Sequence, residues 1–290
     1  MLLEGNVRSA IGVCSDLLFG THQRDAMNMD RFFDTVLVRP PSSTYINCVS
    51  TNPARGSIDL ALARHQHREY VSILKESGVN VIELPPSNKF PDSVFMQDPA
   101  LLGSRRSVIG RLCEKSRQGE ESALYEDLLK LHIEVGEMCF TSLPGTLEGG
   151  DILVTEERIY VGESQRTNRE GIEQLATCLS SFDVKPVKTS LMHLLCGCSY
   201  LSDGTIIISP ELVSPESFPG FRFVMIPREE AYAADALYFG ERRVLIPSGF
   251  PKTSSKLREA GYKPVEVEVS EFRKGDGGVT CLCSPIYTLF

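Results

Sequence analysis

Residues 151–162 have the sequence DILVTEERIYVG, in which two short apolar runs flank a polar turn. This pattern predicts an antiparallel pair of strands. The periodicity that follows predicts a helix over residues 168–181 and one further strand over 184–188. The same order of paired strands, helix and closing strand recurs on both sides of this segment, so the segment defines the unit of the fold.

Outward from this unit, further strand pairs are predicted at 94–110, 197–209 and 235–246, and a last pair joins 279–286 to 34–39. Helices are predicted at 57–77, 119–131 and 251–260, with a short one near 210–217; Ser57 is the expected cap of the first helix and Gly78 its end. Closing strands are expected at 79–84, 133–138, 221–226 and 264–268. They recur about every 40 to 50 residues, a spacing typical of propeller-like repeats.

Five such modules predict a single α/β domain over residues 34–290, after an N-terminal extension of residues 1–33 that contains one helix pattern at 7–19. A chain of 290 residues with 42% hydrophobic composition can bury a core of that size. No stretch of the sequence divides the domain as a linker would.

The formal net charge of −8 argues against a nucleic-acid partner. No uncharged apolar run reaches the roughly 18 residues that a membrane helix needs, so no membrane partner is expected either. The nine cysteines are scattered rather than arranged as a disulfide framework, and the N-terminus is a poor secretory signal. A reducing cytoplasm is therefore the expected location. The sequence leaves a homo-oligomer open.

The C-terminal segment 274–290, KGDGGVTCLCSPIYTLF, is the most informative one for chemistry. Its glycines permit a tight turn before Cys281, and a cysteine that starts a strand after such a turn can face a pocket. Cys283 lies two residues further on the same strand face, so spacing alone does not choose between the two. A buried structural cysteine is the alternative for either.

His193 in LMHLLCGC and Glu148 in LEGGD complete a set suited to nucleophilic catalysis, in which a thiolate attacks and a histidine moves protons. A core histidine and a solvated turn carboxylate are the structural alternatives. A different set of residues would bind zinc, although such spacing on a strand is uncommon; it comprises His193, Cys196, Cys198, Cys281 and Cys283.

Two further groups of polar residues suit a small substrate with a cationic and an anionic end. Asp92, Gln97 and Asp98 lie in PDSVFMQDP, where carboxylates can hold a guanidinium through charge-assisted hydrogen bonds. Arg111 and Arg166 can clamp a carboxylate with their rigid guanidinium forks. Solvated loop residues are the alternative interpretation for each.

These segments, in this order, resemble the dimethylarginine dimethylaminohydrolases of the guanidino-group-modifying (pentein) superfamily. The matching pieces are VLVRP, the LARHQHREYV helix, PDSVFMQDPALL, LEGGDILV with YVGESQRTN, the MHLL segment and DGGVTCLC, and together they span residues 34–290. The resemblance implies a five-bladed αβ propeller, in agreement with the modules found above.

The resemblance also implies roles for individual residues. Cys281 would be the nucleophile, His193 the general acid and base, and Glu148 the partner of the histidine. The guanidinium would be held by Asp92 and Asp98, the α-carboxylate by Arg111 and Arg166, and Asp276 would line the pocket beside the cysteine. A covalent thiouronium intermediate would be hydrolysed to citrulline, with no metal or organic cofactor.

Two positions bear on which arginine derivative is the substrate. Gln97 stands where the relatives that act on dimethylarginine carry an acid. Leu195 stands where arginine deiminases and amidinotransferases have an aspartate, which favours a pocket for dimethylarginine. A deiminase-like hydrolase of another guanidine substrate and a non-catalytic binding protein of the same fold are the alternatives.

Overall fold

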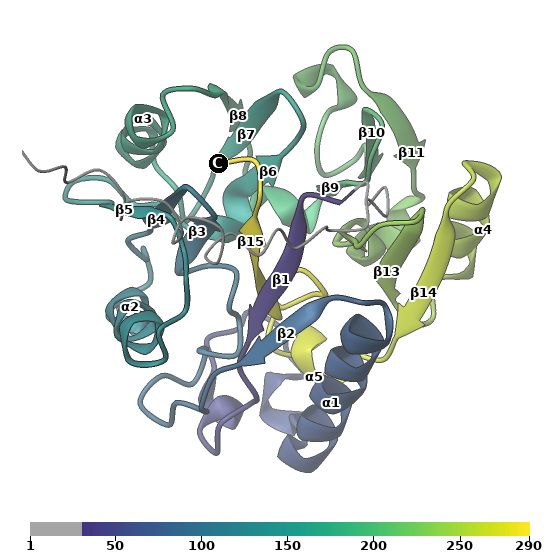
Figure 1. Cartoon of the computed structure of the whole chain (residues 1–290). Helices are drawn as coiled ribbons and strands as arrows, with labels where there is room; N and C mark the ends of the chain where they lie inside the picture. The colour runs from purple at the N-terminus through teal and green to yellow at the C-terminus, as the bar shows by residue number, and fades with distance from the viewer. Residues whose placement is uncertain (1–30) are drawn as a thin grey trace, which may run out of the picture.

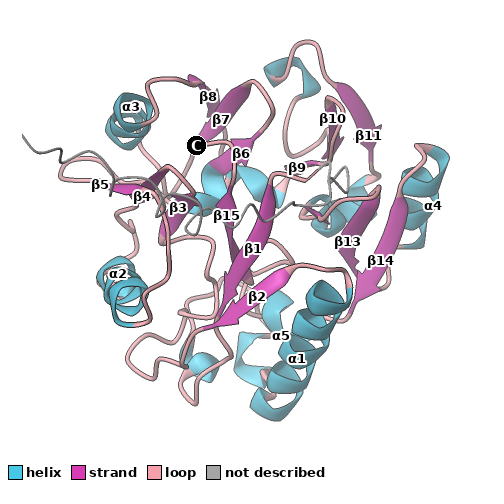
Figure 2. Ribbon diagram, viewed as in Figure 1, coloured by secondary structure: helices cyan, strands magenta, loops and turns pink. Residues whose placement is uncertain are grey.

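The computed structural model describes residues 31–290 and consists of five similar modules of three strands arranged around a centre, with the helices at the periphery (Figures 1 and 2). In each module two antiparallel strands are followed by a helix, and then by a third strand that pairs in parallel with the second strand. The propeller predicted from the sequence is confirmed.

The bounds of the modules follow the chain. The first contains β15 (Cys283–Tyr287), β1 (Phe33–Val38), α1 (Leu60–Glu76) and β2 (Asn80–Glu83); the second contains β3 (Ala100–Gly103), β4 (Arg106–Ile109), α2 (Glu120–Lys130) and β5 (Glu137–Phe140). The third contains β6 (Ile152–Val154), β7 (Arg158–Glu163), α3 (Arg169–Cys178) and β8 (Asp183–Lys188). The fourth contains β9 (Cys198–Tyr200), β10 (Thr205–Ile208), the single 3₁₀ turn η5 (Pro215–Ser217) and β11 (Arg222–Met225); the fifth contains β12 (Leu237–Tyr238), β13 (Arg243–Pro247), α4 (Pro251–Glu259) and β14 (Lys263–Val267).

The first module closes the ring because its strands come from both ends of the described chain. β15 pairs antiparallel with β1 and, on its other edge, parallel with β3, where Ile286 is in register with Leu102. The first two modules therefore share one six-stranded sheet. This closure brings the segment before β15, which carries Cys281, close to the loops that follow the other strands.

Several boundaries differ from those predicted. The N-cap of α1 is Asp59, whose carboxylate accepts hydrogen bonds from the N–H groups of Ala61 and Leu62, and Ser57 belongs to a preceding 3₁₀ turn. β5 starts at Glu137, later than expected. α5 (Ser270–Arg273) was not predicted, because its four residues are too few for a helical period.

The predicted extension of residues 1–33, with its helix at 7–19, lies mostly outside the described residues, and the division into extension and domain stays a prediction. Arg31 already belongs to the packed structure, because its guanidinium donates to the carbonyl groups of Phe239 and Gly78. Within residues 31–290 no helix is long and apolar enough to cross a membrane.

One disulfide joins two neighbouring modules, between Cys139 of β5 and Cys178 at the end of α3. The sequence does not predict this disulfide, because the two residues are 39 positions apart and have no motif in common. The cysteines of interest for chemistry, Cys281 and Cys283, are both free.

Candidate active site

A cavity at one end of the propeller collects most of the residues singled out in the sequence. Its lining includes Asp92, Asp98, Arg166, His193, Asp276 and Cys281, together with Arg117. These residues come from five loops, those before β3, after β4, after β7, before β9 and before β15.

Glu148 and His193 form a buried pair beside this cavity. Nε2 of His193 lies 2.8 Å from Oε2 of Glu148, and Oε1 of Glu148 accepts a hydrogen bond from the N–H of Cys113 at 2.9 Å. Burial opposes protonation of His193, but the charges of Asp98 and Glu148 outweigh it and raise the pKa of the imidazole to about 9. The histidine therefore carries a proton at neutral pH and can act as an acid.

Gly150 and Asp151 of the LEGGD motif help to position the pair of Glu148 and His193. A Cβ atom on Gly150 would lie 2.7 Å from Nδ1 of His193, so only glycine allows the ring to approach. Asp151 accepts hydrogen bonds from the N–H of Leu194 at 2.8 Å and from the hydroxyl of Ser164 at 2.7 Å. One buried carboxylate thus fixes both the loop of His193 and the loop that leads to Arg166.

On the acidic side of the cavity, Oδ2 of Asp98 accepts a hydrogen bond from Arg117 at 2.7 Å. Burial disfavours ionisation of Asp98, but His193 and Arg117 outweigh it and hold the pKa of this carboxyl below its usual value. Oδ1 of Asp98 is buried without a hydrogen-bond partner. It lies 3.8 Å from Nδ1 of His193 and is free to accept a donor from a ligand.

Arg117 was not identified from the sequence. Its surroundings, EKSRQGEE, are typical of a solvated loop, yet the side chain is buried and binds Glu120 through two hydrogen bonds of 3.2 and 2.9 Å. Arg111, which the sequence suggested for the α-carboxylate, does not line the cavity. Its backbone pairs with Leu147 and its guanidinium donates to the carbonyl of Gly145.

Arg166 enters the cavity from the loop after β7, as expected. Its Nη1 atom is buried without a partner, and Nη2 lies 4.0 Å from the sulfur of Met192. The cavity thus contains one unsatisfied acceptor, on Asp98, and one unsatisfied donor, on Arg166. Buried polar atoms are almost always hydrogen-bonded, so this pair indicates a ligand with both a donor and an acceptor.

Asp276 and Asp92 also line the cavity, and both accept hydrogen bonds from the segment between β1 and α1. Asp276 has a positive φ of 60° and accepts hydrogen bonds from the N–H and hydroxyl of Thr51. Asp92 accepts from the N–H of Val49 at 3.0 Å, and burial raises the pKa of this carboxyl.

Cys281 and Cys283 have different surroundings. Cys281 is half-buried and lines the cavity, whereas Cys283 is fully buried in β15 and directs its sulfur toward the carbonyl of Thr280. Burial, followed by the charges of Asp235 and Asp98, raises the pKa of the Cys281 thiol well above its ordinary value. The thiol of the free enzyme is therefore neutral.

The zinc alternative based on cysteines is not assembled in the described part of the chain. Cys198 directs its sulfur to the carbonyl of Leu194. Among residues 31–290, the group whose potential ligand atoms lie within 4.8 Å of one another consists of Asp98, Glu148 and His193. Three of these atoms already have partners: Nε2 of His193 and Oε2 of Glu148 pair with each other, and Oδ2 of Asp98 accepts from Arg117.

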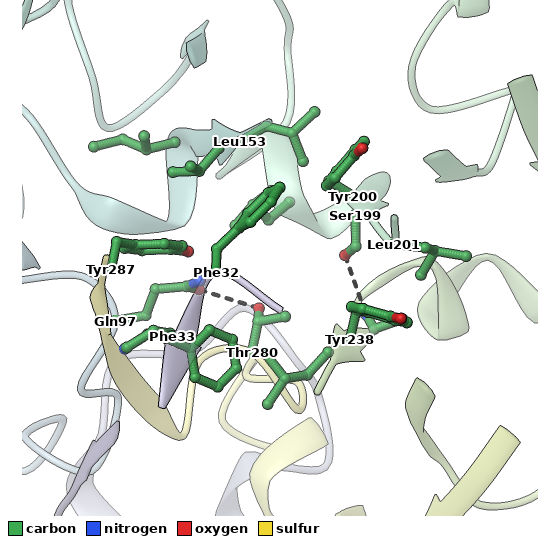
Figure 3. A pocket seen from close by; sticks show the side chains of 16 residues that line it. Phe32, Phe33, Gln97, Leu153, Ser199, Tyr200, Leu201, Tyr238, Thr280 and Tyr287 are labelled. Carbon is green, nitrogen blue, oxygen red and sulfur yellow. Dashed lines mark hydrogen bonds between the residues drawn. The ribbon is translucent and has the colours of Figure 1, made fainter. Parts of the chain in front are cut away.

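Gln97 does not reach the cavity, in contrast to the expectation from sequence. Its side chain accepts a hydrogen bond from the hydroxyl of Thr280 at 3.1 Å and lines a second cavity of about 60 Å³ at the centre of the propeller (Figure 3). Phe32 and Tyr287 also line this central cavity. The residues that follow Gln97 and Thr280 are Asp98 and Cys281, so the Gln97–Thr280 hydrogen bond lies between the two cavities.

Known proteins resemble this chain in sequence and in structure. A family model described as N,N dimethylarginine dimethylhydrolase, eukaryotic, matches residues 45–207. The N(G),N(G)-dimethylarginine dimethylaminohydrolase of Pseudomonas aeruginosa is 36% identical over 253 residues, which cover 86% of this chain and 98% of the relative.

Two solved structures are also similar. A cysteine-to-serine variant of the P. aeruginosa enzyme in complex with citrulline has a TM-score of 0.82 and 34% identity, covering 88% of this chain and 100% of that one. A histidine-to-glycine variant of a dimethylarginine dimethylaminohydrolase, present as its adduct with S-methyl-L-thiocitrulline, has a TM-score of 0.82 and 35% identity over the same shares.

Proposed function

The chain belongs to the dimethylarginine dimethylaminohydrolase family, and we propose that it hydrolyses a free N-methylated arginine to citrulline and an amine, with Cys281 as the nucleophile. The fold is accordingly the five-bladed pentein propeller. The observation that carries the proposal is the pair of unsatisfied buried atoms, Oδ1 of Asp98 and Nη1 of Arg166, in the cavity that also contains Cys281 and His193.

An amino acid with a guanidinium side chain has groups that match these two atoms. Its cationic end donates to the carboxylate of Asp98, and its α-carboxylate accepts from Arg166. Arg117 already binds two acids, so we assign it the role of holding Asp98 ionised and in place. Asp92 lies beside the same cavity as a second carboxylate for the guanidinium.

The charges around Cys281 explain why the substrate takes part in its own activation. Cys281 is neutral, because burial and nearby carboxylates disfavour the thiolate. A guanidinium bound beside the sulfur adds a positive charge, which stabilises the thiolate and lowers the pKa of the thiol. The thiolate then forms a bond to the guanidinium carbon, which Asp98 and Asp92 hold in position.

His193 serves both halves of the reaction. Because its pKa is raised to about 9, it holds a proton that it gives to the departing methylamine, and a thiouronium remains on Cys281. The neutral imidazole then takes a proton from water, which attacks the same carbon. The C–S bond breaks, citrulline leaves, and His193 is protonated again. Glu148 orients the ring throughout and stabilises its charged form.

Substrate preference depends on the neighbourhood of the guanidinium. Leu195 has no hydrogen-bonding side chain and lines the central cavity rather than the one that contains Cys281, so it gives the guanidinium of plain arginine no partner. A charge-assisted hydrogen bond contributes about 1.5–3 kcal/mol. A methylated guanidinium has fewer N–H groups and loses less, which favours it over arginine.

Hydrolysis of arginine, monomethylarginine, dimethylarginine and agmatine to their ureido products tests this assignment. The product is citrulline for the first three and N-carbamoylputrescine for agmatine. We expect kcat/KM to be higher for the methylated arginines than for arginine, with agmatine poor because it has no carboxylate for Arg166. A clear preference for plain arginine would support a deiminase-like hydrolase instead. Absence of a ureido product from every member of the panel would contradict the proposed function.

We further propose that the protein works in the cytoplasm and binds neither nucleic acid nor membranes. A hydrodynamic measurement would show whether it forms a homo-oligomer. The reaction requires Cys281 as a free thiol, which a reducing compartment maintains, and the net charge of −8 disfavours nucleic acid. The disulfide between Cys139 and Cys178, in contrast, is typical of an oxidising compartment. Counting free thiols in protein taken directly from cells would decide between the two.

A further inference from the structure

A buried carboxylate, that of Asp235, contacts the reacting sulfur and has no role in the mechanism above. It lies between η6 (Arg228–Ala234) and β12, with 5% of its surface exposed. Its Oδ1 atom accepts a hydrogen bond from the N–H of Thr280 at 2.8 Å, and the thiol of Cys281 donates to Oδ2 at 3.7 Å. Asp235 therefore accepts the hydrogen bond that the thiol of the nucleophile donates.

Gly278, the last residue of the DGG motif, lies against the carboxylate of Asp235. A Cβ atom on Gly278 would lie 2.2 Å from Oδ2 of Asp235, closer than any side chain allows. Glycine at this position thus makes room for the carboxylate as well as for the turn. The close fit fixes Oδ2 against the sulfur of Cys281, and no other acceptor for this thiol is found among the described residues.

The mechanism needs a group that takes the thiol proton, and His193 is poorly suited to that step. Nε2 of the ring is occupied by Glu148, and Nδ1 faces Asp98. The ring is already protonated at neutral pH, because its pKa is about 9. A protonated histidine can release the amine, but it cannot first accept a proton from the thiol.

We propose that Asp235 is the general base that takes the thiol proton of Cys281 when the substrate binds. This inference rests on the proposed function and deepens it. As the C–S bond forms, the S–H proton moves to Oδ2 of Asp235, and the imidazolium of His193 protonates the leaving amine. When the thiolate is expelled in the second half of the reaction, Asp235 returns the proton, so the enzyme ends as it began.

The surroundings of Asp235 suit a base that works near neutral pH. Burial raises the pKa of its carboxyl to about 6, which makes it a stronger base than an exposed carboxylate yet leaves it ionised at pH 7. The titratable groups that face it come from several elements: Tyr232 of its own segment, Tyr70, Asp98, Cys196, Cys281 and Cys283. Asp98 is the charged one among them, and it also raises the pKa.

Asp235→Asn tests the proposal, because it keeps the shape and the bond from Thr280 but removes the base. Two rates are measured on the full-length protein: turnover of dimethylarginine, and alkylation of Cys281 by iodoacetamide without substrate, quantified by peptide mass spectrometry. We expect kcat to fall about 10²-fold, typical of the loss of one general base. We expect alkylation to become faster at pH 8, because removal of a negative charge lowers the pKa of the thiol.

A fall in kcat together with faster alkylation of Cys281 distinguishes a general base from the other roles that Asp235 could have. If both rates fell, Asp235 would merely support the fold; if both rose, it would act only through its charge, and either outcome would overturn the proposal. Glu230→Gln is the matched control, because Glu230 is a buried carboxylate on η6 that binds Thr253 outside the cavity. This variant should leave both rates unchanged.

Wild-type protein provides a second test that does not depend on folding of a variant. A base with this pKa predicts that kcat/KM falls as the pH drops through about 6, and a profile that stays flat to pH 5 would overturn the proposal. Failure of the proposed function would look different: dimethylarginine would not be turned over at any pH, while the effect of Asp235→Asn on alkylation could still be measured.

Discussion

Oε2 of Glu148 lies 2.8 Å from Nε2 of His193, and solvent does not reach the Glu148 side chain. A carboxylate so close to an imidazole in a buried site favours the protonated ring, and together with Asp98 it raises the pKa of His193 to about 9. The acid that releases the amine is therefore available over the whole physiological pH range, and is lost only as the pH rises through about 9.

Glu148→Gln should shift this alkaline limit. The amide keeps a hydrogen bond to the ring but removes the negative charge, so the pKa of His193 falls and the decline of kcat/KM on the alkaline side moves to lower pH. A pH series of kcat/KM on dimethylarginine from pH 6 to 10 measures the shift. An unchanged alkaline limb in the variant would show that Glu148 does not set the protonation of His193.

Arg166 should determine affinity for the α-carboxylate. In Arg166→Gln the unsatisfied donor at Nη1 is gone, and a charge-assisted bond of about 1.5–3 kcal/mol is lost, equivalent to roughly a 10- to 150-fold fall in kcat/KM for methylarginine. Agmatine, which has no carboxylate, should lose little. The ratio of the two values distinguishes this role from general damage, and an equal loss for both would contradict it. Arg111→Gln is the matched control, since its side chain lies outside the cavity.

Activity should survive exhaustive chelation, because none of the proposed steps uses a metal. Zinc should instead inhibit, by binding the Cys281 thiolate. The test compares citrulline formation before and after dialysis against a chelator, and then with added zinc. Loss on chelation and recovery on zinc addition would revive a metal mechanism, with Asp98, Glu148 and His193 as the ligands to examine.

The modules of the fold were predictable because each strand pair and helix carries its own local pattern. These local patterns do not show which cavity a side chain lines where loops pack together. Gln97 and Asp98 are neighbours in a segment without regular alternation, and they line different cavities. A resemblance that covers both positions does not resolve this, because each side chain is directed by a partner outside the segment: Thr280, 183 positions from Gln97, and Arg117, 19 positions from Asp98.

For a related reason, the sequence does not identify Arg117 and Asp235 as functional residues. Arg117 is surrounded by polar residues and becomes buried only through its bonds to Asp98 and Glu120. Asp235 lies in the run AYAADALY, where an isolated acid has no signature of its own, and its importance arises from ring closure. When β15 joins β1, the segment before β15 places Cys281 against Asp235, which is 46 residues away.

The covalent step at Cys281 is the central claim, and trapping the intermediate tests it most directly. His193→Gly lacks the acid for amine release, but S-methyl-L-thiocitrulline carries a thiol leaving group that needs little protonation. After incubation, intact-protein and peptide mass spectrometry should show a gain equal to this compound minus methanethiol, located on Cys281. The gain should persist when Cys283 is changed to Ser and disappear when Cys281 is changed to Ser. An adduct on another residue, or none under conditions where His193→Gly binds the compound, would contradict the account.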